Sequence, residues 1–98
     1  MLTSKQRAKL KGMANTIDTI LQVGKEGIGE QLTNQVRDAL TARELIKISV
    51  HETAPCTPQE AAEELSTAIK CEVVQVIGRK IVFYKRNGKK PKIELGKL

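Results

Sequence analysis

The sequence of 98 residues predicts a single α/β domain, in which one helix is followed by strands and helices in the order βαβαββ. Three patterns predict this class. Apolar residues recur every three to four positions in residues 30–42 and 58–69, which is typical of helices with one buried face. Residues 45–50 alternate between apolar and polar, and two β-branched runs flank Gly78 near the C-terminus. We therefore expect a four-stranded mixed sheet with helices packed against it.

The N-terminal part is predicted to form a helix from Ser4, acting as the N-cap, to about Ala14. Residues 17–23 follow as a strand with Ile20, Leu21 and Val23 as its apolar members. Two glycines three positions apart, Gly24 and Gly27, interrupt this strand. A loop over residues 24–27, called the GxxG loop below, is therefore expected before the next helix.

The remaining elements are a helix over 30–42, a strand over 45–50, a helix over 58–69 and a hairpin of strands 73–77 and 81–84. The third helix has the clearest start, because Thr57 and Glu60 form a capping-box pattern around Pro58. Ala61, Ala62, Leu65, Ala68 and Ile69 supply its expected apolar face. Strands joined through a helix should be parallel with right-handed crossovers, so the second and third helices should cover the same face of the sheet.

Composition changes after Lys85 to a polar, basic run. We expect one folded domain over residues 1–86 and a basic C-terminal tail over 87–98, whose removal should lower ligand affinity without affecting folding.

Charge is divided unevenly along the chain, whose net charge is +6. Residues 1–28 carry five basic and two acidic groups, residues 29–78 carry four and eight, and residues 79–98 carry eight and one. Basic charge gathered in this way is typical of a protein that binds a polyanion, because neutralised phosphates release their counterions. Lysines that only solubilise an exposed face are the alternative explanation.

Few residues could support catalysis. His51 is the single histidine, and the glycines at 24, 27 and 29 have neither Walker nor dinucleotide-binding spacing. Cys56 and Cys71 form no C-x-x-C pair and are interpreted as reduced thiols of a cytoplasmic protein. No stretch approaches the roughly 20 apolar residues of a membrane span. We therefore expect no enzymatic activity, no metal and no cofactor.

The GxxG loop carries the most specific functional signal. Glycines between a strand and a helix let the backbone approach a ligand, and the helix N-terminus offers N–H groups to phosphate. KH domains clamp single-stranded nucleic acid with such a loop. Lys25 favours this function, whereas Glu26 places an acid at the tip; a simple turn is the alternative.

Base stacking on aromatic rings is not expected, since Phe83 and Tyr84 are the only aromatic residues. As neighbours on a strand they point to opposite faces, and a structural, half-buried Tyr84 is favoured over one that stacks a base. The predicted RNA-binding residues are Gly24, Lys25, Glu26 and Gly27 of the loop, with Lys5, Arg7, Lys9, Lys11, Arg79, Lys80, Lys85, Arg86, Lys89 and Lys90.

Four stretches together resemble the CRM (chloroplast RNA splicing and ribosome maturation) domain, in its small bacterial YhbY-like branch. They are RAKLKGMA at residues 7–14, QVGKEGI at 22–28, ELIKI at 44–48 and VQVIGRKIVFYK at 74–85. Two positions depart from the family pattern: Asn15 stands where histidine is common, and Gly29 stands where a Thr or Ser N-cap is common.

The resemblance implies a fold like the C-terminal domain of translation initiation factor three, and binding of ribosomal RNA in precursors of the large subunit. It assigns backbone clamping to Gly24 and Gly27 and a phosphate contact to Lys25. We expect a monomer that acts in ribosome assembly by binding. A protein-interaction adaptor with only non-specific RNA anchoring is the main alternative, and an RNA-modifying enzyme would need a cofactor site that the sequence does not show.

Overall fold

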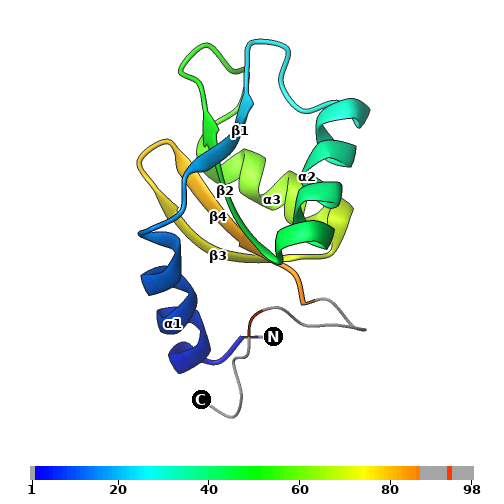
Figure 1. Cartoon of the computed structure of the whole chain (residues 1–98). Helices are drawn as coiled ribbons and strands as arrows, with labels where there is room; N and C mark the ends of the chain where they lie inside the picture. The colour runs from blue at the N-terminus through cyan, green and yellow to red at the C-terminus, as the bar shows by residue number, and fades with distance from the viewer. Residues whose placement is uncertain (1, 87–92, 94–98) are drawn as a thin grey trace.

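A computed structural model describes residues 2–86 and 93 of the chain. It contains the predicted elements in the predicted order (Figure 1). The elements are α1 (Ser4–Ala14), β1 (Thr19–Val23), α2 (Glu30–Arg43), β2 (Leu45–Val50), α3 (Pro58–Ile69), β3 (Glu72–Ile77) and β4 (Lys80–Tyr84). The α/β class with three helices and a four-stranded sheet is therefore confirmed.

Two helices begin with a capping box. For α3 this is the predicted one, in which Thr57 Oγ1 accepts the Glu60 N–H at 3.1 Å and Glu60 Oε1 accepts the Thr57 N–H at 2.8 Å. For α1 the prediction of Ser4 as the cap is wrong by one residue. Thr3 is the N-cap, because its Oγ1 accepts the Gln6 N–H at 3.1 Å and Gln6 Oε1 accepts the Thr3 N–H at 3.0 Å.

The sheet has the strand order β1-β2-β4-β3. β1 and β2 are parallel, whereas β4 is antiparallel to both of its neighbours, β2 and β3. The strands β2 and β3, which α3 connects, are thus parallel to each other with β4 inserted between them. β1 begins at Thr19 instead of Ile17, and only two residues, Gly78 and Arg79, separate β3 from β4.

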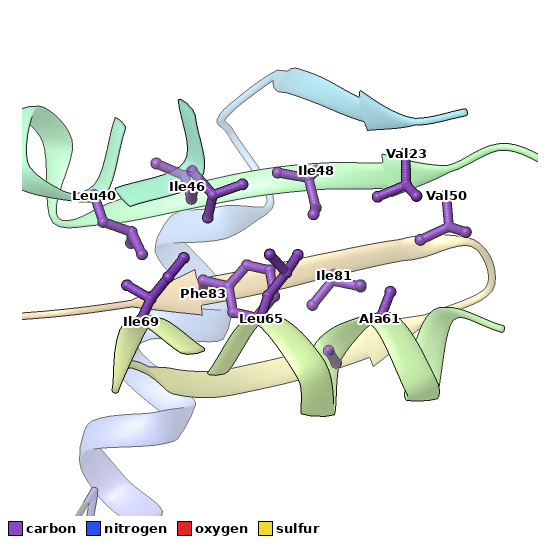
Figure 2. Close-up of a cluster of buried hydrophobic side chains, with 12 residues drawn as sticks. Val23, Leu40, Ile46, Ile48, Val50, Ala61, Leu65, Ile69, Ile81 and Phe83 are labelled. Carbon is purple, nitrogen blue, oxygen red and sulfur yellow. The ribbon is translucent and has the colours of Figure 1, made fainter. Parts of the chain in front are cut away.

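The larger core lies between the sheet and the two helices α2 and α3, so these helices cover one face as predicted (Figures 1 and 2). Ala68 is exposed and does not belong to the apolar face of α3, contrary to the prediction. The buried members of this core are Val23, Val36, Leu40, Ile46, Ile48, Val50, Ala61, Ala62, Leu65, Ile69, Ile81 and Phe83.

The opposite face of the sheet carries a smaller core beneath α1. Leu10 and Ala14 of the helix pack there with residues of β2, β3 and β4, and Ile93 lies against the same cluster. The buried sheet residues are Leu45, Val74, Val82 and Tyr84. Since Leu45 begins β2 and Tyr84 ends β4, α1 covers one end of this face.

The other end of the sheet carries three connections. The carboxyl ends of β1 and β2 lie there, followed by the GxxG loop and residues 51–57, beside the β3–β4 hairpin turn (Figure 1). β2 spans six residues, so this end lies about 17 Å from the end under α1, at roughly 3.3 Å per residue. The fold therefore separates the loop from the basic first helix.

Candidate nucleic-acid interface

The GxxG loop is a tight turn at the end of β1. The Gly27 N–H donates to the Gly24 carbonyl oxygen at 3.0 Å, which closes the turn. Lys25 and Glu26 lie between the two glycines and are both exposed. The turn therefore presents one cation and one anion to solvent at its tip.

The two glycines of this loop differ in what the fold requires of them. Gly27 has φ +74°, and a Cβ added there would lie 2.9 Å from Cγ of Pro55 in the β2–α3 connection. Any other residue at 27 would strain the backbone and displace Pro55. An added Cβ at Gly24, in contrast, would have no atom within 4 Å. The fold thus explains Gly27 but gives no steric reason for Gly24.

Helix α2 follows the loop and begins without a side-chain cap. Its N-cap is Gly29, which has no side chain to accept from the first turn, whereas Thr3 and Thr57 cap the other two helices. The exposed Glu30 provides an acidic residue in the first turn of α2. The departure at Gly29 has left the helix intact, as glycine is a tolerated cap.

The predicted contact residue Arg79 is engaged within the protein. Its Nε donates to the Val50 carbonyl at 2.6 Å, and its Nη2 donates to the His51 carbonyl at 2.7 Å. The His51 N–H in turn donates to the Val23 carbonyl at 2.9 Å. These bonds link the hairpin turn to the ends of β2 and β1. Arg79 therefore holds the loop end of the sheet together, and Lys80 beside it is exposed.

Arg7 on α1 has a similar internal role. Its Nη1 donates to the carbonyl oxygens of Val73 and Val74, the latter at 3.0 Å, where the pairing of β3 with β4 shifts register. This fastens α1 to the sheet. The three lysines of α1 are exposed: Lys5, Lys9 and Lys11. No acidic residue occurs within α1.

The start of the C-terminal segment is also tied to the domain. Lys85 Nζ donates to the Ile69 carbonyl at the end of α3, at 2.9 Å, so this lysine is partly buried while Arg86 is exposed. The Ile93 N–H donates to Oε1 of Glu44 at 2.8 Å. Lys89 and Lys90 lie outside the described residues. The expected tail thus includes one residue that packs against the domain.

Neither aromatic residue offers a ring to a base. Phe83 is fully buried in the larger core, and Tyr84 is 4% exposed in the smaller one. Burial raises the pKa of the Tyr84 hydroxyl, and the nearby carboxylate of Glu44 raises it further. Tyr84 is therefore a buried structural residue and does not present its ring for stacking on a base.

The predicted residues fall into two groups at opposite ends of the domain. Lys25, Glu26 and Lys80 lie with the loops, and the lysines of α1 lie beneath the other end. One basic residue between them was not among the predicted contacts. Lys47 is half-buried in the middle of β2, on the face opposite to Ile46 and Ile48. The alternation of residues 45–50 predicts this direction, but it does not by itself identify Lys47 as an RNA contact.

Metal-binding groups and membrane-spanning helices are absent from the part of the chain that the structure describes. There, no group of three or more His, Cys, Asp or Glu could hold a metal ion. No helix within residues 2–86 is long and apolar enough to cross a membrane. Both cysteines are free thiols.

Comparison with known proteins identifies relatives along nearly the whole chain. A model of the CRS1 / YhbY (CRM) domain matches residues 2–85. The protein of Bacillus subtilis named "Probable RNA-binding protein YqeI" is 40% identical over 95 residues, covering 97% of this chain and 99% of that protein. A protein of Haemophilus influenzae named "RNA-binding protein" is 32% identical over 94 residues, covering 96% and 94%.

Among solved structures, the solution structure of the hypothetical protein SAV1595 from Staphylococcus aureus superposes with a TM-score of 0.81. It is 45% identical in sequence and covers 98% of this chain and 100% of its own. All three comparisons agree with the resemblance found in the sequence: the domain model, the relatives and the solved structure. The chain belongs to the CRS1 / YhbY (CRM) domain family.

Proposed function

We propose that this protein binds RNA without catalysing a reaction, and that the GxxG loop contacts the phosphate backbone. Lys25 supplies a positive charge to a phosphate, while Gly24 and Gly27 allow the RNA backbone to approach the loop. The relatives named as RNA-binding proteins support this class of ligand.

The observation that carries the proposal is the unexplained glycine at position 24. Its conformation and surroundings would accept a side chain, since an added Cβ meets nothing within 4 Å. Open space over a glycine beside an exposed lysine suits the close approach of a ligand backbone. Gly27, with its positive φ and the hydrogen bond from its N–H to the Gly24 carbonyl oxygen, then holds the turn in position.

Charge adds a second, independent argument. Helix α1 carries Lys5, Lys9 and Lys11 on its exposed surface and contains no acidic residue. In contrast, α3 contains Glu60, Glu63 and Glu64 and no basic residue. A phosphate backbone is attracted to the first surface and repelled by the second. The proposed RNA surface therefore runs from the loop toward α1 and avoids α3.

The resemblance to the YhbY-like branch extends this proposal to a biological role. We propose that the RNA is ribosomal RNA in precursors of the large ribosomal subunit, and that a monomer acts there in ribosome assembly. Residues 1–86 form the RNA-binding domain, and the basic residues of 87–98 add contacts to phosphate. Free Cys56 and Cys71 suit a reducing cytoplasm.

The direct experiment measures RNA affinity of Lys25→Glu and Gly24→Ala across a salt series. Lys25→Glu should weaken binding more than tenfold at moderate salt, because it removes one phosphate contact and adds a repulsion. Gly24→Ala should weaken binding while leaving the melting temperature unchanged, since the fold has space for the methyl group.

The matched control is Arg37→Glu, which reverses one charge on the exposed face of α2. It should change RNA affinity much less than Lys25→Glu. Equal affinities for Lys25→Glu, Gly24→Ala and the unmodified protein would reject the loop as the RNA contact. Affinity that hardly depends on salt would favour the alternative of a protein-interaction adaptor.

A further inference from the structure

The face of the sheet that carries α1 is only partly covered by that helix. Cross-strand register defines two rows of side chains beyond the residues α1 buries. The first row is Gln22, Ser49, Lys80 and Ile77, and the second row is Thr19, Lys47, Val82 and Gln75, each taken in the strand order β1-β2-β4-β3. Val82 is buried beneath α1, and we call the other seven residues the open face.

The direction of the open face follows from Val82. Val82 packs in the cluster beneath α1, so its cross-strand partners Lys47 and Gln75 point to the same side. Lys80 precedes Val82 by two residues and shares that side, together with its partner Ser49. Ile46 and Ile48 point away, into the larger core.

Exposure and charge distinguish this face from the rest of the sheet. Gln22, Lys80 and Ile77 are exposed, with Ile77 at 58%, whereas Thr19, Lys47, Ser49 and Gln75 are half-buried. Two of the seven residues are lysines and none is acidic. Four others carry hydrogen-bonding groups that can reach base edges: Thr19, Gln22, Ser49 and Gln75. Such a face, with two cations and several hydrogen-bonding side chains, complements a single RNA strand better than it complements an apolar surface.

We propose that the open face binds a single strand of RNA that leads from the GxxG loop to α1. This inference rests on the proposed function of the loop and extends it to residues that the loop does not include. Lys80 lies at the loop end of the sheet and Lys47 lies in the middle of β2. Lys47 therefore lies between the loop end, where Lys80 stands, and the end covered by α1, along the length of about 17 Å of β2.

Recognition on this face does not use aromatic stacking. The rings of Phe83 and Tyr84 are buried, so phosphates bind Lys47 and Lys80 while the amides of Gln22 and Gln75 contact base edges or ribose hydroxyls. The exposed side chain of Ile77 offers an apolar contact to a base at the outer strand. An RNA duplex keeps its base edges paired, so a single strand fits this arrangement better.

The test compares two oligouridylates, one of about four nucleotides, the length a GxxG loop clamps, and one of about 12 nucleotides. The variant carries both Lys47→Gln and Lys80→Gln, and the control is Arg37→Gln on α2. On the longer oligomer the double variant should reduce the log-log salt slope by about 1.4, at roughly 0.7 for each single-strand phosphate contact. On the shorter oligomer the slope should stay unchanged.

A second measurement follows the side-chain amide resonances of Gln22 and Gln75 during titration with the longer oligomer, where both should shift. The open face would be rejected as an RNA contact if the double variant had the same salt slope as Arg37→Gln and the Gln22 and Gln75 resonances did not shift. The effect of Lys25→Glu tests the loop separately. Equal shifts with an RNA duplex would also overturn the open face, because single-stranded RNA is the proposed ligand. If Lys25→Glu bound RNA as tightly as the unmodified protein, the proposed function of the loop would be rejected instead.

Discussion

The two faces of the sheet differ in how many residues they bury and in the charge of the helices that cover them. Among the described residues, 12 are buried in the core under α2 and α3, whereas six are buried in the core under α1. Helix α3 contains acidic residues and no basic residue, whereas α1 contains basic residues and no acidic residue. The comparison indicates that one face provides most of the hydrophobic free energy, which leaves the other face free to carry lysines for a ligand.

The largest effect on stability is expected from Phe83→Ala. Phe83 is fully buried in the larger core, among Leu65, Ile69 and Ile46 (Figure 2). Removing a buried ring should lower the free energy of unfolding by about 3 to 5 kcal/mol. Urea denaturation measures this loss. A loss below about 1 kcal/mol would contradict the assignment of the main core to this face.

Substituting one buried leucine in each core tests the difference between the two faces more directly. Leu65 of α3 and Leu10 of α1 are both fully buried, one in each core. Each substitution to alanine should cost about 2 to 5 kcal/mol. Only Leu10→Ala should also weaken RNA binding, because it loosens the helix that presents Lys5, Lys9 and Lys11. RNA titrations below the melting temperature of both variants test this. An equal loss of affinity in both would remove the distinction between the faces.

A smaller effect is expected from ending the chain at Arg86. The truncation removes the Ile93 N–H that donates to Glu44, whose side chain is fully buried. Loss of a hydrogen bond to a buried charged group should cost about 1 to 3 kcal/mol. The sequence had suggested no effect on folding.

Thermal denaturation of the truncated chain and of full-length Ile93→Ala checks this expectation. Ile93→Ala retains the backbone N–H and the basic residues, so it should cost less than the truncation. If both variants melt like the unmodified protein, the Ile93 contact does not contribute to stability.

The smallest effect concerns Cys71, which packs against the larger core. Burial raises the pKa of its thiol from 9.0 to about 11, despite the opposing charge of Lys85. The thiol of the unfolded chain therefore loses its proton at a lower pH than the thiol of the folded chain. The contribution of buried Cys71 to the free energy of unfolding is complete below pH 9 and is lost as the pH rises toward 11. The difference in melting temperature between the unmodified protein and Cys71→Ala should change over this range. A difference independent of pH would contradict the burial of this thiol.

Sequence patterns predicted the elements because most of them depend on local periodicity and caps. The Thr57–Glu60 capping box and the alternation of residues 45–50 were sufficient for α3 and β2. The N-cap of α1 was predicted one residue too late because Thr and Ser are both good N-caps. Thr3 is the N-cap because it forms a capping box with Gln6. Ala68 was included in a buried face because alanine fits both environments.

The candidate site was less predictable because contacts between distant residues decide which cations remain available. Arg7 and Arg79 look like phosphate ligands in sequence, yet both donate to backbone carbonyls across the fold. Glu44 has no sequence signal for its burial at a φ of +66°. Lys47 became a candidate only when the register placed it beside Val82.

The most direct test of the account maps amide chemical-shift changes along the whole chain as single-stranded RNA is added. The division between the faces predicts large changes at Gly24 and Lys25, at Lys47 and Lys80, and along α1, with little change over α3. Changes concentrated on α3, with none in the GxxG loop or on the open face, would contradict the account.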